Sequence, residues 1–308
     1  MKNPKPIFKY IGGKRWMQEK LREKVSLVLS KNPQVDSYTE PFCGGLGSFL
    51  SVYDILIQNN IKTITLNDIN SNIINFYIDV RDNPLLLISK YFSLEASFFE
   101  RIPYNWPQMK KELNKEDQKI FLDDANNFYR QVRNTFNILP NGIDKSAHLL
   151  FLQKHAFNGV YRENKKGEHN VPFNWSGDFV NKEETQNRVI ELSAILNSLN
   201  IILSFDNFSD LRYRKNTLYY LDPPYLNDNG VENKYNKSGF SLSDQRTLIY
   251  AVKDCPFVYS NHYSDILIDM FISAECNFEI DSVSRKNIMT SSKENRGNDK
   301  KELILSSK

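Results

Sequence analysis

Residues 38–47 read Tyr-Thr-Glu-Pro-Phe-Cys-Gly-Gly-Leu-Gly, and the interpretation of the fold begins from them. Tyr38–Phe42 is typical of a short strand, and the glycines after it predict a loop that leads into a helix over Ser48–Ile57. A second strand is predicted over Ile61–Leu66, where β-branched and polar residues alternate before Asp68. A strand, a glycine loop, a helix and a strand that ends in an acid form one half of a doubly wound nucleotide-binding sheet.

The glycine loop Glu40–Gly47 predicts close approach of a ligand to the backbone, because glycine has no side chain and permits positive φ. Its spacing is not G-x-G-x-x-G, and it lacks the lysine of a phosphate-binding loop. We therefore expect an adenosine ligand without a pyrophosphate, a description that S-adenosylmethionine fits. Asp68 is then placed to accept hydrogen bonds from both ribose hydroxyls. The alternative is an ordinary glycine turn beside a helix-capping aspartate.

Asp222-Pro223-Pro224-Tyr225 follows the apolar run Leu218–Leu221, so it is expected at the carboxyl end of a central strand, where open α/β sheets bind ligands. Two successive prolines stop the strand and make the turn rigid. The Asp222 carboxylate and the Pro223 carbonyl are suited to accept both N–H groups of an exocyclic base amine, while Tyr225 stacks on the base. The alternative is a structural turn with a packed tyrosine.

The rest of the chain predicts an α/β sheet interrupted by a helical insertion. Residues 1–74 and 190–308 are assigned to the sheet domain, and residues 75–189 to the insertion. Within the insertion, Gly159–Arg162 and Asn170–Phe173 flank a polar turn and predict a β-hairpin. Helices are predicted at 15–30, Leu85–Phe92, Asp117–Arg133, Ala147–His155 and Glu183–Leu199, and strands at Ile201–Phe205, Thr217–Leu221, Pro256–Ser260, Phe278–Val283 and Glu302–Ser306.

Composition limits the function classes. The 308 residues are 40% hydrophobic and 25% charged, and no run of 18 apolar residues predicts a transmembrane span. The N-terminal residues do not resemble a secretory signal, and three widely spaced cysteines form neither a disulfide framework nor a metal pair, so a reducing cytoplasm is expected. Net charge is only +3, yet residues 1–31 hold nine Lys/Arg against two Glu, which favours a polyanionic partner.

Taken together, these motifs resemble the Dam-type (D12 class) DNA adenine N6-methyltransferase family over nearly the whole chain. In chain order, the matching stretches are Lys9-Tyr10-Ile11-Gly12-Gly13-Lys14, Glu40–Gly47, Asn67-Asp68-Ile69-Asn70, Phe157–Arg162 with Asn170-Val171-Pro172-Phe173, Asp222–Tyr225, and Ser260-Asn261. The resemblance implies a Rossmann-like SAM-dependent methyltransferase sheet with an inserted target-recognition domain, and an enzyme that methylates a flipped adenine in duplex DNA. No metal and no membrane are implied.

The resemblance also implies residue roles. Asp222, Pro223 and Tyr225 would be catalytic. S-adenosylmethionine would be bound by Tyr10, Lys14, Phe42, Gly44, Gly45, Asp68, Phe208 and Asp222, with Lys14 facing its carboxylate. DNA would be contacted by Lys9, Phe157, Asn158, Arg162 and Pro172, with Phe157 as an aromatic wedge and Arg162 suited to guanine.

Some residues depart from the family pattern. The resemblance implies GATC or a related site as the target. Trp175-Ser176-Gly177 stands where many relatives carry Gly-Arg-Tyr, and this difference weakens the transfer of their usual GATC specificity. A cognate restriction endonuclease is a candidate partner. His155 and His169 flank the predicted hairpin without a metal-ligand cluster and are expected at the surface or in a groove.

Three alternatives stay open at this point. The same amine chemistry would serve an N4-cytosine DNA methyltransferase, although S-P-P-Y is commoner there than the D-P-P-Y found here. The scaffold would also suit a non-catalytic DNA-binding or SAM-sensing protein, but no motif is lost that would indicate this. The last alternative is methylation of structured RNA or of a protein amide.

Overall fold

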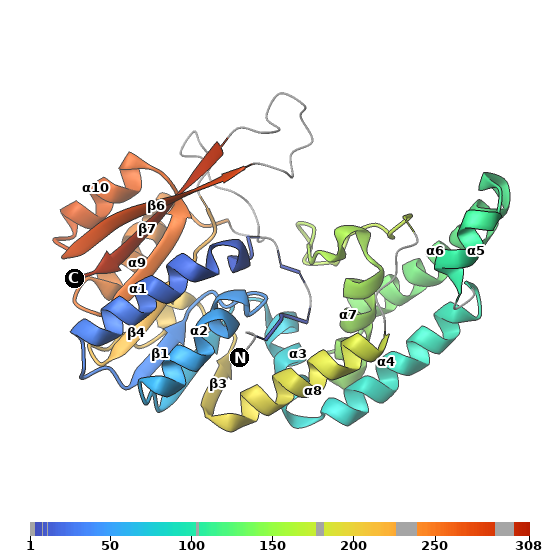
Figure 1. Cartoon of the computed structure of the whole chain (residues 1–308), viewed down its shortest axis with the longest axis horizontal. Coiled ribbons are helices and arrows are strands. Elements are labelled where there is room, and N and C mark those ends of the chain that lie inside the picture. Colours follow the sequence, from blue (N-terminus) through green and yellow to red (C-terminus); the bar gives the residue numbers. More distant parts are fainter. Residues whose placement is uncertain are drawn as a thin grey trace. The chain divides into compact units, whose positions relative to one another are not determined.

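The computed structural model describes residues 4–7, 9–10, 12–102, 105–176, 182–225, 239–286 and 299–308. The chain divides into two compact units, which are coloured along the sequence in Figure 1. The helical unit comprises Met1–Gly13 and Asn70–Ser198, and the sheet unit comprises Lys14–Ile69 and Leu199–Lys308. The chain thus leaves the sheet unit after Ile69 and returns to it at Leu199.

The sheet unit is built on a seven-stranded, mostly parallel sheet with the strand order β3-β2-β1-β4-β5-β7-β6. The pairings among β1 to β5 are parallel, and β7 is antiparallel to both β5 and β6. This arrangement confirms the predicted α/β, Rossmann-like class. The strands are β1 Ser37–Glu40, β2 Thr63–Asn67, β3 Asn200–Ser204, β4 Thr217–Leu221, β5 Phe257–His262, β6 Phe278–Lys286 and β7 Asp299–Ser307.

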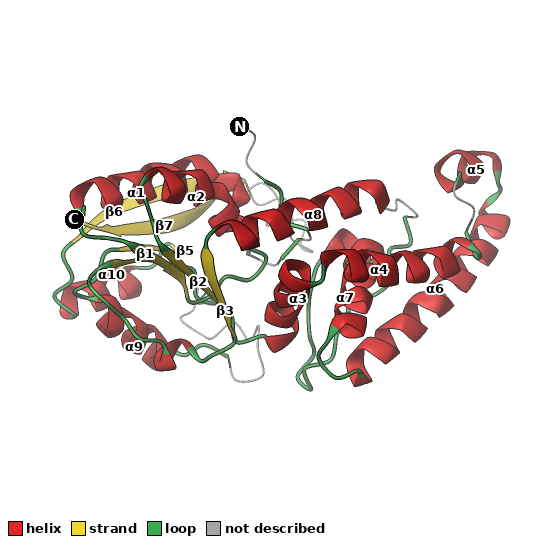
Figure 2. Ribbon diagram, turned by 90° about the horizontal axis from the view of Figure 1, so that it is seen from below, coloured by secondary structure: helices red, strands yellow, loops and turns green. Residues whose placement is uncertain are grey.

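Helices cover both faces of this sheet, as Figure 2 shows: α1 and α2 lie on one face, and α9 and α10 on the other. Because both faces are covered, the central strand β4 is buried at all five positions and consists of apolar residues, tyrosines and one threonine. The helical segments here are η1 Arg15–Met17, α1 Gln18–Lys31, α2 Gly47–Gln58, η3 Phe208–Asp210, α9 Leu242–Val252 and α10 Asp265–Ser273.

The predicted elements of the sheet unit are found close to their expected bounds. The main difference is at the first strand, which was predicted over Tyr38–Phe42 and ends at Glu40. The cause is Pro41, which has no N–H to donate to a neighbouring strand. The last two strands pair as predicted, with Phe278 opposite Ser307 and Val283 opposite Glu302.

The helical unit packs its helices around an aromatic-rich core. Asn70 and Asn114 cap α3 and α6, because each side chain accepts hydrogen bonds from two backbone N–H groups of the first turn. Within the part of the chain that the structure describes, no helix has the length and apolar character to cross a membrane. The helices are α3 Ser71–Asp82, α4 Pro84–Phe99, α5 Trp106–Glu112, α6 Lys115–Ile138, α7 Ile143–His155, η2 Phe157–Gly159 and α8 Lys182–Ser198.

The predicted β-hairpin is only partly present. The chain does reverse, but the described backbone forms isolated antiparallel bridges, Ala156 with Phe173 and Glu163 with His169, rather than two continuous strands. Two local features interrupt a ladder. Pro172 has no N–H, and the Asn164 side chain accepts from the backbone N–H groups of Lys166 and Glu168 at the tip. We call residues 156–174 the reversal segment.

Candidate active site

The predicted motifs of the sheet unit lie where the direction of strand order changes. β1 is flanked by β2 on one side and by β4 on the other, so the loops after β1 and β4 leave the sheet at a topological switch point. The glycine loop follows β1, Asp68 follows β2, and Asp222–Tyr225 follows β4. Ligands of open α/β sheets bind at this position.

The glycine loop is held in an unusual backbone conformation. Gly44 has φ 44° and Leu46 has φ 60°, both in the left-handed region that favours glycine. The backbone N–H of Gly44 donates to Oδ2 of Asp68 at 3.0 Å, and the N–H of Cys43 donates to the carbonyl of Asn67 at 2.8 Å. The loop after β1 is thereby tied to the end of β2. Cys43 is buried there, and burial raises the pKa of its thiol well above the usual value, so the thiol stays protonated.

Asp222 is the centre of a buried polar cluster. Its Oδ1 lies 2.9 Å from Nζ of Lys14, whose side chain is 3% exposed, and also accepts from the Ser260 hydroxyl at 3.1 Å. The Ser260 hydroxyl in turn lies 2.9 Å from the hydroxyl of Tyr220. Burial raises the pKa of Asp222, and the neighbouring Lys14 ammonium opposes that rise. Lys14 therefore favours a carboxylate that can accept hydrogen bonds.

The fourth residue of the D-P-P-Y motif has its own set of contacts. The Tyr225 hydroxyl donates to Oε2 of Glu302 at 2.8 Å. Nζ of Lys14 lies 4.4 Å from the centre of the Tyr225 ring, and the His262 ring stands across it with centroids 4.4 Å apart. The loop carbonyl of Pro224 accepts a 3.4 Å hydrogen bond from the Gln245 side chain. The tetrapeptide is thus held from β5, β7 and α9.

Three aromatic rings gather beside the glycine loop. Phe42 lies 5.7 Å from Phe208 and 5.5 Å from Phe240, and Phe208 lies 5.2 Å from Phe240, measured between ring centroids. Phe208 and Phe240 are buried, whereas Phe42 is half-buried. Such a cluster offers an apolar wall at the same edge of the sheet.

Beneath the glycine loop, Glu40 at the end of β1 is completely buried. Its carboxyl group accepts from the Tyr38 hydroxyl at 2.6 Å and from the Ser48 hydroxyl at 3.0 Å. Burial raises the pKa of Glu40 to about 8. Because Ser48 lies in the first turn of α2, Glu40 joins the two ends of the loop.

The sheet unit thus brings together most of the predicted cofactor residues, but Tyr10 belongs to the helical unit. There its ring stacks on Tyr161 at 6.2 Å with an interplanar angle of 10°. The predicted residues in the sheet unit are Lys14, Phe42, Gly44, Gly45, Asp68, Phe208, Asp222, Pro223 and Tyr225.

All five predicted DNA-contacting residues lie in the helical unit and are exposed. Backbone pairing brings them near one another: Lys9 bridges to Val160, and the N–H of Phe157 donates to the carbonyl of Pro172 at 2.8 Å. Asn158 has φ 57°, and Nε of Arg162 donates to Asn170 at 2.8 Å. The side chain of Phe157 is 52% exposed, which is unusual for phenylalanine.

The expected exposure of His155 and His169 is wrong, because both are 1% exposed. Nε2 of His155 lies 2.7 Å from Oε1 of the equally buried Glu95, and its ring packs on Phe98 and Phe151. Burial lowers the pKa of His169 to about 3, so this ring is neutral. In the described ranges, no three His, Cys, Asp or Glu residues are grouped so as to hold a metal ion.

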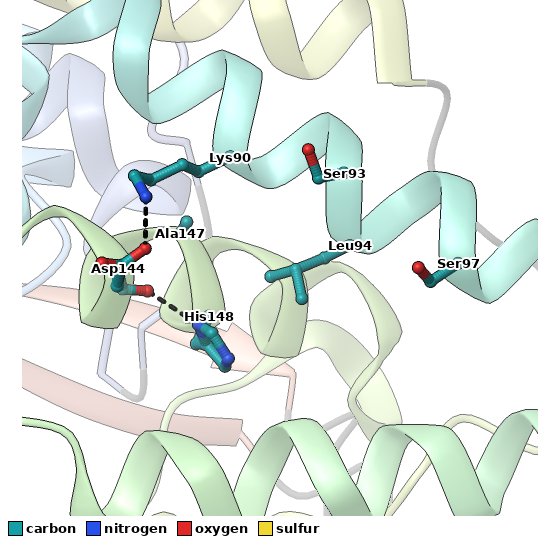
Figure 3. A pocket seen from close by; sticks show the side chains of 7 residues that line it. All are labelled: Lys90, Ser93, Leu94, Ser97, Asp144, Ala147 and His148. Atoms are coloured by element: carbon teal, nitrogen blue, oxygen red, sulfur yellow. Dashed lines mark hydrogen bonds and ion pairs between the residues drawn. The ribbon is translucent and has the colours of Figure 1, made fainter.

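One hollow of the helical unit lies between α4 and α7, with a volume of about 310 Å³, and contains none of the predicted site residues (Figure 3). Lys90 and Asp144 form an ion pair of 2.6 Å at one end of it. The lining residues are Lys90, Ser93, Leu94, Ser97, Asp144, Ala147 and His148.

Several residues of the cluster were not predicted as site residues. Ser260 belongs to a stretch that matches the family pattern, but no role was predicted for it. For Glu302, His262 and Phe240, no sequence motif indicated a place in the site. Glu302 is 77 positions from Tyr225 and is brought to it by pairing of β5 with β7. Glu40 belongs to the glycine-loop motif, but its own role in the loop was not predicted.

A Rossmann-like sheet with a glycine loop after β1, an acid after β2 and Asp-Pro-Pro-Tyr after β4 defines a methyltransferase scaffold. The sequence pattern of the D12 class N6 adenine-specific DNA methyltransferases matches residues 10–293. The chain therefore belongs to the D12 class N6 adenine-specific DNA methyltransferase family. It is accordingly an enzyme that methylates adenine in DNA, which decides against the N4-cytosine and non-catalytic alternatives.

Curated relatives cover most of the chain. The chain is 29% identical over 312 residues to the Type II methyltransferase M.MjaIII of Methanocaldococcus jannaschii, covering 98% of each protein. It is 26% identical to the DNA adenine methylase of Serratia marcescens, covering 88% of each, and 25% identical to that of Vibrio cholerae, covering 80% of this chain and 76% of the relative.

Proposed function

We propose that this enzyme transfers the methyl group of S-adenosylmethionine to the N6 amine of an adenine extruded from duplex DNA. The observation that carries the proposal is the half-buried Asp222 carboxylate, held by Lys14 at 2.9 Å and Ser260 at 3.1 Å, directly after β4. Residues 1–74 and 190–308 would form the SAM-binding catalytic domain, and residues 75–189 the target-recognition domain.

The residues at the sheet edge fit S-adenosylmethionine by their chemistry. Asp68, 9% exposed, presents a carboxylate that already accepts the Gly44 N–H and suits ribose hydroxyls. Gly44 and Gly45 would allow close approach of the methionine part, and Lys14 would face its carboxylate. An apolar wall for the adenine would come from Phe42 and Phe208. Tyr10 is a further proposed cofactor residue.

The bound cofactor would supply an activated methyl group, and the residues of this chain would prepare the acceptor amine. An adenine amine is a poor nucleophile because its lone pair is delocalised into the ring. Two acceptors, the Asp222 carboxylate and the Pro223 carbonyl, would bind its two N–H groups and favour a pyramidal nitrogen with an available lone pair. Tyr225 would hold the base by stacking. Catalysis would then rest on orientation and electrostatics.

The helical unit supports a role in reading DNA. Phe157 would fill or wedge the base stack while the target nucleotide is extruded, which costs a few kcal/mol. Arg162 would bind guanine, and Lys9, Asn158 and Pro172 would contact the neighbouring bases or backbone. The proposed target is GATC or a related site. This function is compatible with a cognate restriction endonuclease as a partner, and also with an enzyme that acts without one.

The test compares two substitutions that should separate chemistry from cofactor binding. Asp222→Ala should abolish N6-methyladenine formation, while S-adenosylmethionine binding should weaken but stay measurable, because the other proposed cofactor residues remain. Asp68→Ala should weaken cofactor binding by about 10- to 100-fold, because it removes a charged hydrogen-bond acceptor. Methyl transfer is measured with radiolabelled cofactor on DNA of mixed sequence, and cofactor affinity by calorimetry.

The matched control is Asp269→Ala, which removes an exposed carboxylate from α10 in the same unit. It should leave both readouts unchanged. Substantial turnover by Asp222→Ala would remove the catalytic assignment. Mapping of modified bases in DNA from cells that otherwise lack methylation would identify both the base and the target sequence.

A further inference from the structure

The environment of Tyr225 contains a carboxylate that the proposed chemistry does not use. Glu302 on β7 is 6% exposed, and its Oε2 accepts the Tyr225 hydroxyl at 2.8 Å. A charged acceptor makes a stronger hydrogen bond than a neutral one, and burial shields that bond from water. The bond therefore restrains the far end of the Tyr225 ring.

The sheet itself determines the position of Glu302. β5 and β7 are antiparallel neighbours, and His262 is directly opposite Glu302 in their register. The His262 ring contacts the Tyr225 ring with centroids 4.4 Å apart, and Lys14 lies over that ring with Nζ 4.4 Å from its centre. Glu302 thus holds the Tyr225 hydroxyl, while His262 and Lys14 contact the ring itself.

We propose that Glu302 is a positioning residue for methyl transfer, acting through the Tyr225 hydroxyl to hold the ring in the orientation that receives the target adenine. The inference rests on the proposed function, in which Tyr225 stacks on that base. Stacking requires a defined ring plane, and small errors in orientation at a reaction centre lower the rate of the chemical step. Glu302 itself does not touch the reacting atoms.

The decisive experiment is a double-mutant cycle between Glu302→Leu and Tyr225→Phe. Tyr225→Phe keeps the stacking ring and removes only the hydroxyl. Each substitution alone should lower kcat by about 10- to 100-fold, the range expected for a hydrogen bond to a charged group. Because Tyr225→Phe already removes the bond to Glu302, Glu302→Leu should cost nothing more in that background, and the double variant should be no slower than Tyr225→Phe. If the two losses multiply in the double variant, the proposal is wrong.

The conservative variant guards against misfolding. Glu302→Gln keeps an oxygen acceptor, so its kcat should lie between those of the wild type and Glu302→Leu. If Glu302→Leu does not fold, the cycle is run with Glu302→Gln, whose smaller loss should vanish in the Tyr225→Phe background. An equal loss in both backgrounds would overturn the proposal.

Two further measurements separate this inference from general damage. Affinity for S-adenosylmethionine should fall by less than kcat does in Glu302→Leu, because Glu302 contacts Tyr225, which is assigned to the base and not to the cofactor. The control is Glu279→Gln, which removes a carboxylate of β6 that forms an ion pair with Lys31 and does not contact Tyr225. The kcat of Glu279→Gln should equal that of the wild type. Loss of cofactor binding in Glu302→Leu would assign it a structural role and overturn the proposal.

Failure of this inference is distinguishable from failure of the proposed function. If the wild type forms N6-methyladenine and Asp222→Ala does not, the proposed function holds, whatever the cycle shows. If the wild type transfers no methyl group to DNA, the proposed function fails first, and the positioning role of Glu302 fails with it.

Discussion

At the scale of single residues, burial decides the behaviour of the carboxylates. Asp222 and Glu40 lie at the ends of adjacent strands, and burial raises the pKa of both. Lys14 opposes the rise at Asp222, whereas the donors that the described residues offer to Glu40 are the hydroxyl groups of Tyr38 and Ser48. Asp222 is thereby suited to accept hydrogen bonds from a base, whereas Glu40 stays protonated near neutral pH and links β1 to α2.

The protonation of Glu40 predicts a pH-dependent difference between the wild type and Glu40→Gln. In the folded state its pKa is about 8, against an ordinary value of 4.5. The folded protein therefore keeps a proton that the unfolded chain releases, and the contribution of Glu40 to stability is full below pH 4.5 and falls as pH rises toward 8. The free energy of unfolding of the wild type should drop relative to Glu40→Gln across that interval, by a few kcal/mol.

Urea unfolding of both proteins at a series of pH values measures this difference. Other titrating groups are common to the two proteins and cancel in the comparison. Parallel stability curves for the wild type and Glu40→Gln would show that Glu40 does not hold its proton in the folded protein.

At the scale of elements, α7 ends in a buried pair that supports the reversal segment. His155 is the last residue of α7, and its carbonyl accepts the N–H of Asn174 at 2.8 Å. Its ring is held by Glu95 of α4. The exposed Phe157 follows two residues later. The buried pair therefore fixes the start of the segment that carries the proposed DNA contacts.

This pairing predicts a large loss of stability in His155→Leu. The substitution leaves the buried Glu95 side chain without its imidazole partner, which should cost about 1–3 kcal/mol in the free energy of unfolding. Replacing both residues, as in Glu95→Leu with His155→Leu, should be less destabilising than the single change, because no carboxylate then remains buried. Chemical denaturation of the single and double variants measures the two losses; a double variant less stable than His155→Leu would contradict the prediction.

At the scale of the whole molecule, charge is distributed unevenly along the chain. Net charge is +3, while residues 1–31 alone carry nine Lys/Arg and two Glu. Lys9, one of these nine, is exposed in the helical unit, and the exposed Arg162 lies in the reversal segment of the same unit. Local basic surface, rather than total charge, is what a polyanion such as DNA experiences.

DNA affinity should therefore fall steeply with salt. For duplex DNA we expect a decrease of about 0.9 log units in the binding constant, per log unit of salt, for each phosphate contact. Fluorescence anisotropy with a labelled duplex across a range of salt concentrations gives the slope. Lys9→Ala should reduce that slope by about one contact. A binding constant independent of salt would exclude phosphate contacts as a major source of affinity.

The sequence by itself determined the fold class, the order of elements and the motif positions at the sheet edge. These are local properties, because periodicity, prolines and glycines act within a few residues of one another. The glycine loop, Asp68 and Asp222 each follow a predicted strand directly. Because parallel strands run in the same direction, their carboxyl ends, and the residues that follow them, lie at the same edge of the sheet.

Only the tertiary structure decided which side chains touch. The Glu302 contact with Tyr225 depends on the register of β5 with β7, and the burial of His155 depends on Glu95 from another helix. The predicted hairpin formed isolated bridges, and at its tip the Asn164 side chain accepts from the N–H groups of Lys166 and Glu168. Each of these outcomes depends on contacts between residues distant in sequence or on competition among polar groups, which a local pattern does not encode.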